Sequence, residues 1–189
     1  MTFIITTPPA VEPVTLDDAR AQVRVTSTQE DDLLTRLIET ARQHVERTIR
    51  RALITQGWRL YLDDWPPGRV VRLPVTPVQS ITSVTMFDAD GMPLVLNLGD
   101  YDLDGISAPA RLKVMAGVGA SSRMLNGIEI DFTAGYGDAA ANVPAPLRQA
   151  ILLLVAHWYE HREAGIDAAT ASIPFGFDAL IAGYRVPRL

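Results

Sequence analysis

Two histidines and a glutamate near the end of an apolar segment form the pattern that comes closest to a catalytic motif. His157, Glu160 and His161 have the H-x-x-E-H spacing of inverted zinc peptidases. On a helix, two histidines one turn apart can bind zinc while the glutamate activates a water molecule. Such a site needs a third protein ligand, and only three acidic residues follow in a short tail. We therefore predict no metal site, no cofactor and no catalytic residue, with a small zinc-dependent hydrolase as the alternative function.

Other patterns that could carry chemistry are incomplete. The glycine-rich segments 117–122 and 135–137 lack both the G-x-G-x-x-G spacing and the lysine of phosphate-binding loops. The acidic segment 99–105, GDYDLDG, lacks the glutamate that closes a calcium-binding loop. His44 has no serine or cysteine nucleophile pattern nearby, so no catalytic triad can be argued. These features are interpreted as turns, a polar hairpin edge and an ordinary helical residue.

The bulk composition excludes several classes of protein. The chain has 189 residues, of which 48% are hydrophobic and 21% are charged, and its net charge is −5. This balance argues against a nucleic-acid binder held by phosphate contacts, although not against a protein that DNA merely passes. There is no cysteine, hence no disulfide and no thiolate metal site. The N-terminus does not resemble a signal peptide, and residues 150–156 are too few to span a bilayer, so we expect a soluble, intracellularly made protein without a membrane partner.

The segment 143–163, VPAPLRQAILLLVAHWYEHRE, predicts the central helix that carries the histidines. Two prolines fit its first turn, where no intrahelical N–H bond is lost. At about 100° per residue one broad face is apolar. This face consists of Leu147, Ile151, Leu154, Val155 and Trp158. Because Leu152, Leu153 and Ala156 fall on the other side, we expect a helix buried on more than one side, in a bundle core or at a subunit interface.

Two further helices are predicted near the N-terminus. Residues 1–13 contain three prolines and are expected to form an extended arm. Thr15 and Asp18 have the spacing of a capping box for a short helix over 16–23. A longer amphipathic helix is predicted over 29–51. Its charged face, which includes Arg42, is expected either to face solvent or to meet a neighbouring subunit.

The middle of the chain changes from helical to alternating periodicity. Short β segments separated by turns recur between Trp58 and Ala134, the best of them over 78–87. The predicted fold class is α+β, a helical bundle of three to four helices with an antiparallel β unit inserted between the long second helix and the central C-terminal helix. The predicted divisions are an arm with bundle helices (1–54), the β lobe (55–135), the central helix (136–163), and a linker with a docking segment (164–189).

The C-terminal segment is too apolar for a solvated tail. Its apolar and arginine side chains suit docking onto another protein. The candidate docking residues are Ile173, Phe175, Phe177, Leu180, Ile181, Tyr184, Arg185 and Arg188. The alternative is that this segment folds back onto its own bundle.

Four stretches resemble a known family. They are VTLDDARAQVRV (14–25), LLTRLIETARQHVERTIRRALITQGWRLYLD (33–63), ITSVTMFDADG (81–91) and FTAGYGDAAANVPAPLRQAILLLVAHWYEHRE (132–163). Together they resemble the head–tail connector, or adaptor, proteins of long-tailed phages, prophages and gene transfer agents.

The resemblance implies a structural protein in the neck of a particle, made in the bacterial cytoplasm. Such proteins form a homo-oligomeric ring, commonly of about a dozen subunits, beneath the portal protein. DNA passes through the ring without specific binding, a downstream stopper or tail-terminator connector binds the lower face, and the C-terminus reaches the portal. A monomeric β-containing adaptor for one peptide partner remains a third hypothesis.

Overall fold

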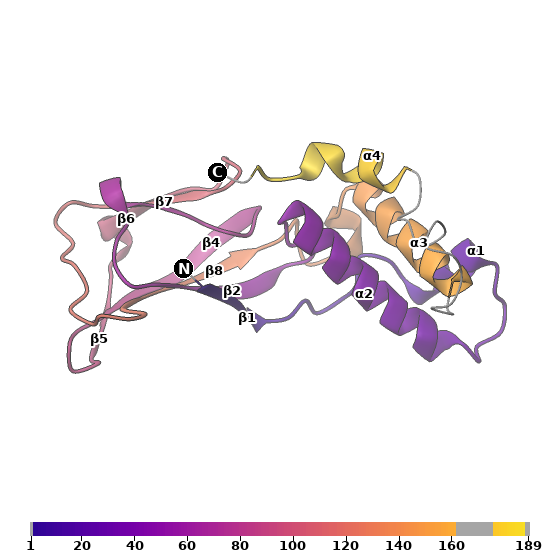
Figure 1. Cartoon of the computed structure of the whole chain (residues 1–189), viewed down its shortest axis with the longest axis horizontal. Helices are drawn as coiled ribbons and strands as arrows, with labels where there is room; N and C mark the ends of the chain where they lie inside the picture. Colours follow the sequence, from indigo (N-terminus) through magenta and orange to yellow (C-terminus); the bar gives the residue numbers. More distant parts are fainter. Residues whose placement is uncertain (1, 162–175, 188–189) are drawn as a thin grey trace. The chain divides into compact units, whose positions relative to one another are not determined.

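A computed structural model describes residues 2–161 and 176–187, and the chain divides into two compact units (Figure 1). The helical unit consists of Ala10–Ile54 and Gly137–Arg185, and the β unit of Met1–Pro9, Thr55–Tyr136 and Val186–Leu189. Helices and antiparallel sheets are both present, which confirms the predicted α+β class.

The helical unit contains four α-helices and two short 3-10 turns among its described residues. The elements are α1 (Leu16–Val23), α2 (Asp31–Ile49), η3 (Ala140–Asn142), α3 (Ala145–Glu160), α4 (Phe177–Ile181) and η4 (Ala182–Tyr184). The predicted capping box is present, because the Asp18 N–H donates to the Thr15 hydroxyl and the Asp18 carboxylate accepts from the Thr15 N–H. None of the helices in the described part of the chain is long and apolar enough to cross a membrane.

Helix α2 is amphipathic, as its sequence predicts. Its buried apolar residues recur at intervals of three and four, and they are Leu34, Ile38, Ala41, Val45 and Ile49. The helix begins two residues later than predicted, at Asp31, and ends at Ile49, because the C-cap Arg50 has a left-handed backbone (φ 58°) that stops the helix. Helices α2 and α3 pack against each other, and α4 packs on α3.

The β unit contains a five-stranded antiparallel sheet with the order β1-β2-β8-β4-β5. Its strands are β1 (Thr2–Thr7), β2 (Gln56–Leu62), β4 (Val78–Phe87), β5 (Pro93–Val95) and β8 (Ile128–Ala134). The N-terminal segment predicted to be extended is a strand over residues 2–7, and it pairs with β2, a pairing that the sequence did not predict. Their β-branched and aromatic side chains favour a strand, and the prolines that suggested an arm lie beyond its end.

A second sheet of the same unit has three strands in the order β3-β7-β6. The strands are β3 (Val70–Arg72), β6 (Tyr101–Asp104) and β7 (Arg111–Val114), accompanied by the short turns η1 (Pro67–Arg69) and η2 (Leu98–Asp100). Buried and partly exposed residues alternate strictly along β8, which shows the face of the sheet on which the core lies. In β8, Ile128, Ile130 and Phe132 are buried on one face, while Glu129 and Asp131 lie on the other face.

Candidate functional site

The predicted central helix is α3, and most of its proposed core face lies inside the helical unit. Leu147, Ile151, Leu154 and Val155 are fully buried. Trp158 is only half-buried, and its ring makes an edge contact with His44 of α2 at a centroid distance of 5.9 Å. The four aliphatic residues thus stabilise the bundle itself, whereas Trp158, with half-buried Leu152 and Leu153, leaves part of α3 at the surface.

The H-x-x-E-H pattern lies at the C-terminal end of α3. Glu160 is the last residue of the helix and His161 is its C-cap. The imidazole rings of His157 and His161 lie 4.5 Å apart, and Nδ1 of His161 is 2.8 Å from the carbonyl oxygen of His157. Among the residues that the structure describes, no three histidine, cysteine or acidic side chains are grouped so that they could hold a metal ion. Glu163 and Asp167, two of the three acidic residues that follow the motif, lie outside the described residues.

Part of the predicted docking segment packs onto the helical unit of its own chain. Phe177 and Ile181 of α4 are fully buried in the helical unit, and the Phe177 ring contacts His44 at 5.8 Å. Nε of Arg51 donates to the Tyr184 carbonyl oxygen at 2.6 Å, which ties η4 to the segment after α2. The part over 176–185 is thus folded onto its own bundle, and Phe177 and Ile181 are not available to a partner.

The remaining docking candidates divide into two groups. Leu180 and Tyr184 are half-buried and Arg185 is exposed, where it pairs with Asp178. Ile173, Phe175 and Arg188 lie outside the described residues. The sequence alone could not separate the two possibilities, because an apolar segment with arginines has the same composition whether it covers its own bundle or a partner.

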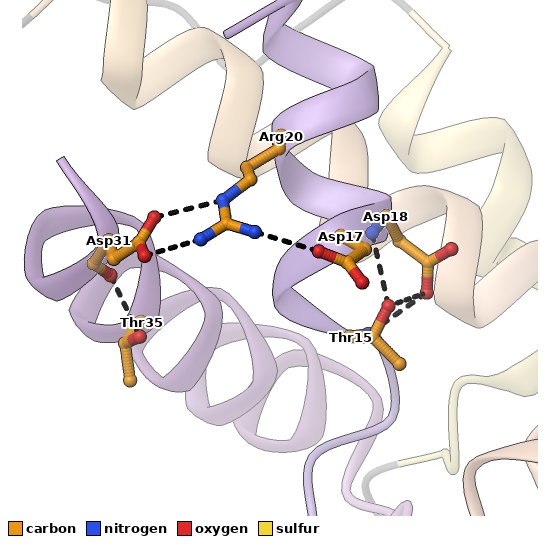
Figure 2. A network of polar contacts seen from close by, with 6 residues as sticks. All are labelled: Thr15, Asp17, Asp18, Arg20, Asp31 and Thr35. Carbon is orange, nitrogen blue, oxygen red and sulfur yellow. Dashed lines mark hydrogen bonds and ion pairs between the residues drawn. The ribbon is translucent and has the colours of Figure 1, made fainter. Parts of the chain in front are cut away.

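A polar network fixes α1 to the start of α2 (Figure 2). The guanidinium of Arg20 donates to both carboxylate oxygens of Asp31, with 2.9 Å from Nε to Oδ1, and to Asp17 at 2.8 Å. Asp31 is the first residue of α2, so its charge also complements the positive end of the helix dipole. The Asp18 capping box lies beside this network on the same short helix. Sequence reasoning found the capping box but missed Arg20.

A second ion-pair cluster is centred on Arg42, which the sequence places on the charged face of α2. Its side chain is nevertheless only 6% exposed. Nε donates to Glu12 at 2.8 Å, and the terminal nitrogen donates to Glu46, one turn further along, at 2.8 Å. Glu46 also accepts the Leu53 N–H at 2.8 Å. Arg42 thus joins the segment before α1 to the middle of α2, and its partner Glu46 also binds the chain after α2.

The two edge strands of the five-stranded sheet are unusually apolar. In β1, TFIITT, Phe3, Ile4 and Ile5 are 43%, 45% and 48% exposed. In β5, PLV, Leu94 and Val95 are 61% and 59% exposed. Neither strand contains a charged residue, although charges are the usual protection of a sheet edge.

Comparison with known proteins gives one family and several similar structures. The model of the head completion protein family matches residues 13–172. The chain is similar to one in the virion of a native gene transfer agent particle, with a TM-score of 0.84 and 29% identity over 100% of this chain and 97% of that one. No curated protein matches the chain significantly.

Two further similar chains come from particle necks. One is from the neck of an empty gene transfer agent particle computed with C6 symmetry (TM-score 0.81, 30% identity), and one is from the neck of a native particle computed with C12 symmetry (TM-score 0.83, 29% identity). Each match covers 100% of this chain and 97% of the other. These matches confirm the resemblance to head–tail connectors, and the chain belongs to the head completion protein family.

Proposed function

We propose that the chain is a structural neck protein of a phage-like or gene transfer agent particle. It forms a ring of about a dozen copies between the head and the tail. The observation that supports this most is the end-to-end similarity, at 29–30% identity, to chains from virion and neck structures. An insertion or a missing unit would have left part of either chain unmatched, so the two units together are what the neck proteins share.

In this proposal the ring lies beneath the portal protein, and DNA passes through its centre. The net charge of −5 supports a channel through which DNA slides without sticking, because a basic lining would hold the phosphates. A downstream stopper or tail-terminator connector binds the lower face of the ring. Portal attachment uses the exposed part of the C-terminal segment, with Arg185 among the described residues, since a guanidinium can bind a carboxylate at two points.

The proposed role is mechanical and not enzymatic. The folded interior of the helical unit is taken up by apolar packing and by the buried Arg42 ion-pair cluster, and nearer the surface Arg20 links α1 to the start of α2. A zinc hydrolase would bind one metal ion per chain and lose it in the His157→Ala variant. Elemental analysis of the purified protein checks this, and stoichiometric zinc that disappears with His157→Ala would contradict the proposal.

Deletion of the gene in a particle-producing strain tests the function directly. We expect DNA-filled heads without tails, because the neck is the surface onto which the tail side assembles. Electron microscopy of the particles, with complementation by the wild-type gene as the control, is the measurement. Native mass spectrometry of the purified chain with and without portal protein then gives the number of copies. Normal tailed particles from the deletion strain would refute the neck role.

A further inference from the structure

The five-stranded sheet of the β unit has edge strands, β1 and β5, whose residues are as apolar as those of an interior strand. In the register, Ile4 pairs with Arg59, Arg59 with Asp131 and Val95 with Thr85, so Ile4 and Val95 lie on the polar face of the sheet. That face is held together at its centre by Arg59, whose guanidinium binds Asp131 at 2.7 and 2.8 Å and Glu129 at 3.0 Å. An isoleucine and a valine at its two margins are therefore out of place on a surface that water covers.

The opposite face of the five-stranded sheet also carries an exposed apolar side chain on each edge strand. Phe3 pairs with Leu60 and Leu94 with Met86, which places Phe3 and Leu94 on the side of the buried core. The interior residues of that face, such as Ile128 and Ile130, are fully buried, whereas Phe3 and Leu94 remain about half exposed or more. Apolar side chains on both faces are typical of a strand that is buried on both sides. Both edges thus carry the residue pattern of a strand that has neighbours.

We propose that these two edges are the two halves of the contact between neighbouring copies of this chain, so that β1 of one copy lies against β5 of the next. The inference rests on the ring proposed above. A cyclic ring needs two different and complementary surfaces on each subunit, and one sheet with two open edges supplies both. The edges match face by face, with Phe3 and Leu94 on the core side and Ile4 and Val95 on the polar side.

The direction of the strands sharpens the proposal. Each neighbouring pair in the order β1-β2-β8-β4-β5 is antiparallel, so β1 and β5 run in the same direction. Copies related by rotation about the ring axis would therefore join these strands in parallel. A contact between two β1 strands would instead be isologous, giving pairs of subunits and not a single-direction ring.

The absence of cysteine from the chain allows a direct test. In Ile4→Cys with Val95→Cys, a short bismaleimide should join neighbouring copies in particles that contain the neck, giving covalent species beyond the dimer on a denaturing gel. Each single variant can give at most dimers. The matched control is Ile4→Cys with Ile106→Cys, because Ile106 is fully exposed but lies outside the strands. A ladder in the first pair and none in the control is the expected result.

A charge at the edge provides the second test. Ile4→Lys should leave the circular dichroism spectrum unchanged and abolish incorporation into necks. Val11→Lys serves as the control, since Val11 is also 45% exposed but lies outside β1. If Ile4→Lys enters necks at the wild-type level, or if necks form and the cysteine pair gives no ladder, the edge contact is refuted while the neck role stands. If the wild-type chain is absent from necks, the proposed function fails, and the edge contact fails with it.

Discussion

The two units of the chain differ in how completely they cover their own apolar surface. Among the described residues, every exposed large hydrophobic side chain except Val11 belongs to the β unit. These side chains are Phe3, Ile4, Ile5, Met92, Leu94, Val95, Leu98, Ile106, Met124 and Leu125. Adjacent exposed apolar residues, such as Phe3, Ile4 and Ile5 along β1, are typical of a surface that contacts another protein. Within the described residues, the helical unit therefore has the surface of a finished domain, whereas the β unit is unfinished in the sense that many of its apolar side chains stay uncovered.

The two units also differ in where their paired charged side chains lie. In the helical unit, Arg20 and Arg42 each bind two carboxylates and so join segments that are distant in sequence. In the β unit, the charges of the five-stranded sheet gather on its central strands, around Arg59, and the edge strands have none. Ion pairs thus link distant segments of the helical unit, whereas the edge strands β1 and β5 of the β unit carry no charge and expose apolar side chains.

The largest expected effect tests whether the helical unit is complete with α4 in place. Phe177→Ala should destabilise this unit by about 3–5 kcal/mol, the range for a fully buried aromatic side chain. Urea unfolding followed by helical circular dichroism is the measurement. Leu180→Ala, in the same short helix but half-buried, is the matched control and should cost clearly less. A loss below about 1 kcal/mol for Phe177→Ala would mean that α4 is undocked in solution, as the docking-arm prediction requires.

The second prediction concerns the buried guanidinium of the helical unit. Arg42→Met should lower the free energy of unfolding by about 3 kcal/mol, because it leaves the Glu12 and Glu46 carboxylates without their cation. Arg36→Met, on the exposed side of the same helix, should change it by less than about 0.5 kcal/mol. Adding Glu12→Gln and Glu46→Gln to Arg42→Met should recover part of the loss. No recovery in this triple variant would show that packing of the arginine stem, and not its charge, carries the effect.

Much of this architecture could be predicted from the sequence, because periodicity reports local structure directly. The helix predicted over 16–23 is α1 residue for residue, and the strand predicted over 78–87 is β4. The buried face of α3 follows from its apolar spacing for the same reason. Short-range patterns such as the capping box of Thr15 were equally visible, since donor and acceptor lie three residues apart.

Features that depend on distant segments could not be predicted. Strand β1 needs β2, which begins at Gln56, and the Arg42 cluster needs Glu12, thirty residues earlier. No local periodicity signals either pairing. The C-terminal segment shows the limit most clearly, because its composition suggested a partner surface and is also compatible with packing onto its own bundle. Burial of Phe177 and Ile181 against the bundle decides between them only once the fold is known.

The third prediction uses pH to separate local from global stabilisation in the helical unit. The Thr15 N–H and hydroxyl donate to the carboxylate of Asp18, and these hydrogen bonds hold the pKa of Asp18 below its ordinary value. Because this pKa is lower in the folded than in the unfolded chain, the stabilisation is fully present above the unfolded pKa of about 3.9 and is lost as pH falls through the folded value. Asp18→Asn should therefore cost about 1 kcal/mol at neutral pH, the usual contribution of a helix cap.

The measurement is thermal unfolding of wild type and Asp18→Asn at several pH values. The difference between them should shrink as pH falls below about 4 and vanish once Asp18 is protonated in the folded state. Asp32→Asn is the control, since Asp32 is exposed in the first turn of α2. A difference that is independent of pH would show that the asparagine acts through packing and not through the lost charge.

The smallest expected effect lies in the β unit and tests the other half of the comparison. Met124→Ser with Leu125→Ser, in the exposed segment before β8, should change the free energy of unfolding by less than about 0.5 kcal/mol. The reason is that 89% and 69% of these side chains are already exposed, so the folded monomer loses almost no buried apolar area. Leu112 is fully buried in β7 of the same unit, so Leu112→Ser should by contrast lower the free energy of unfolding substantially. If the double variant proved as destabilising as Leu112→Ser, the β unit would already cover these residues in solution, and the contrast between a finished and an unfinished unit would be lost.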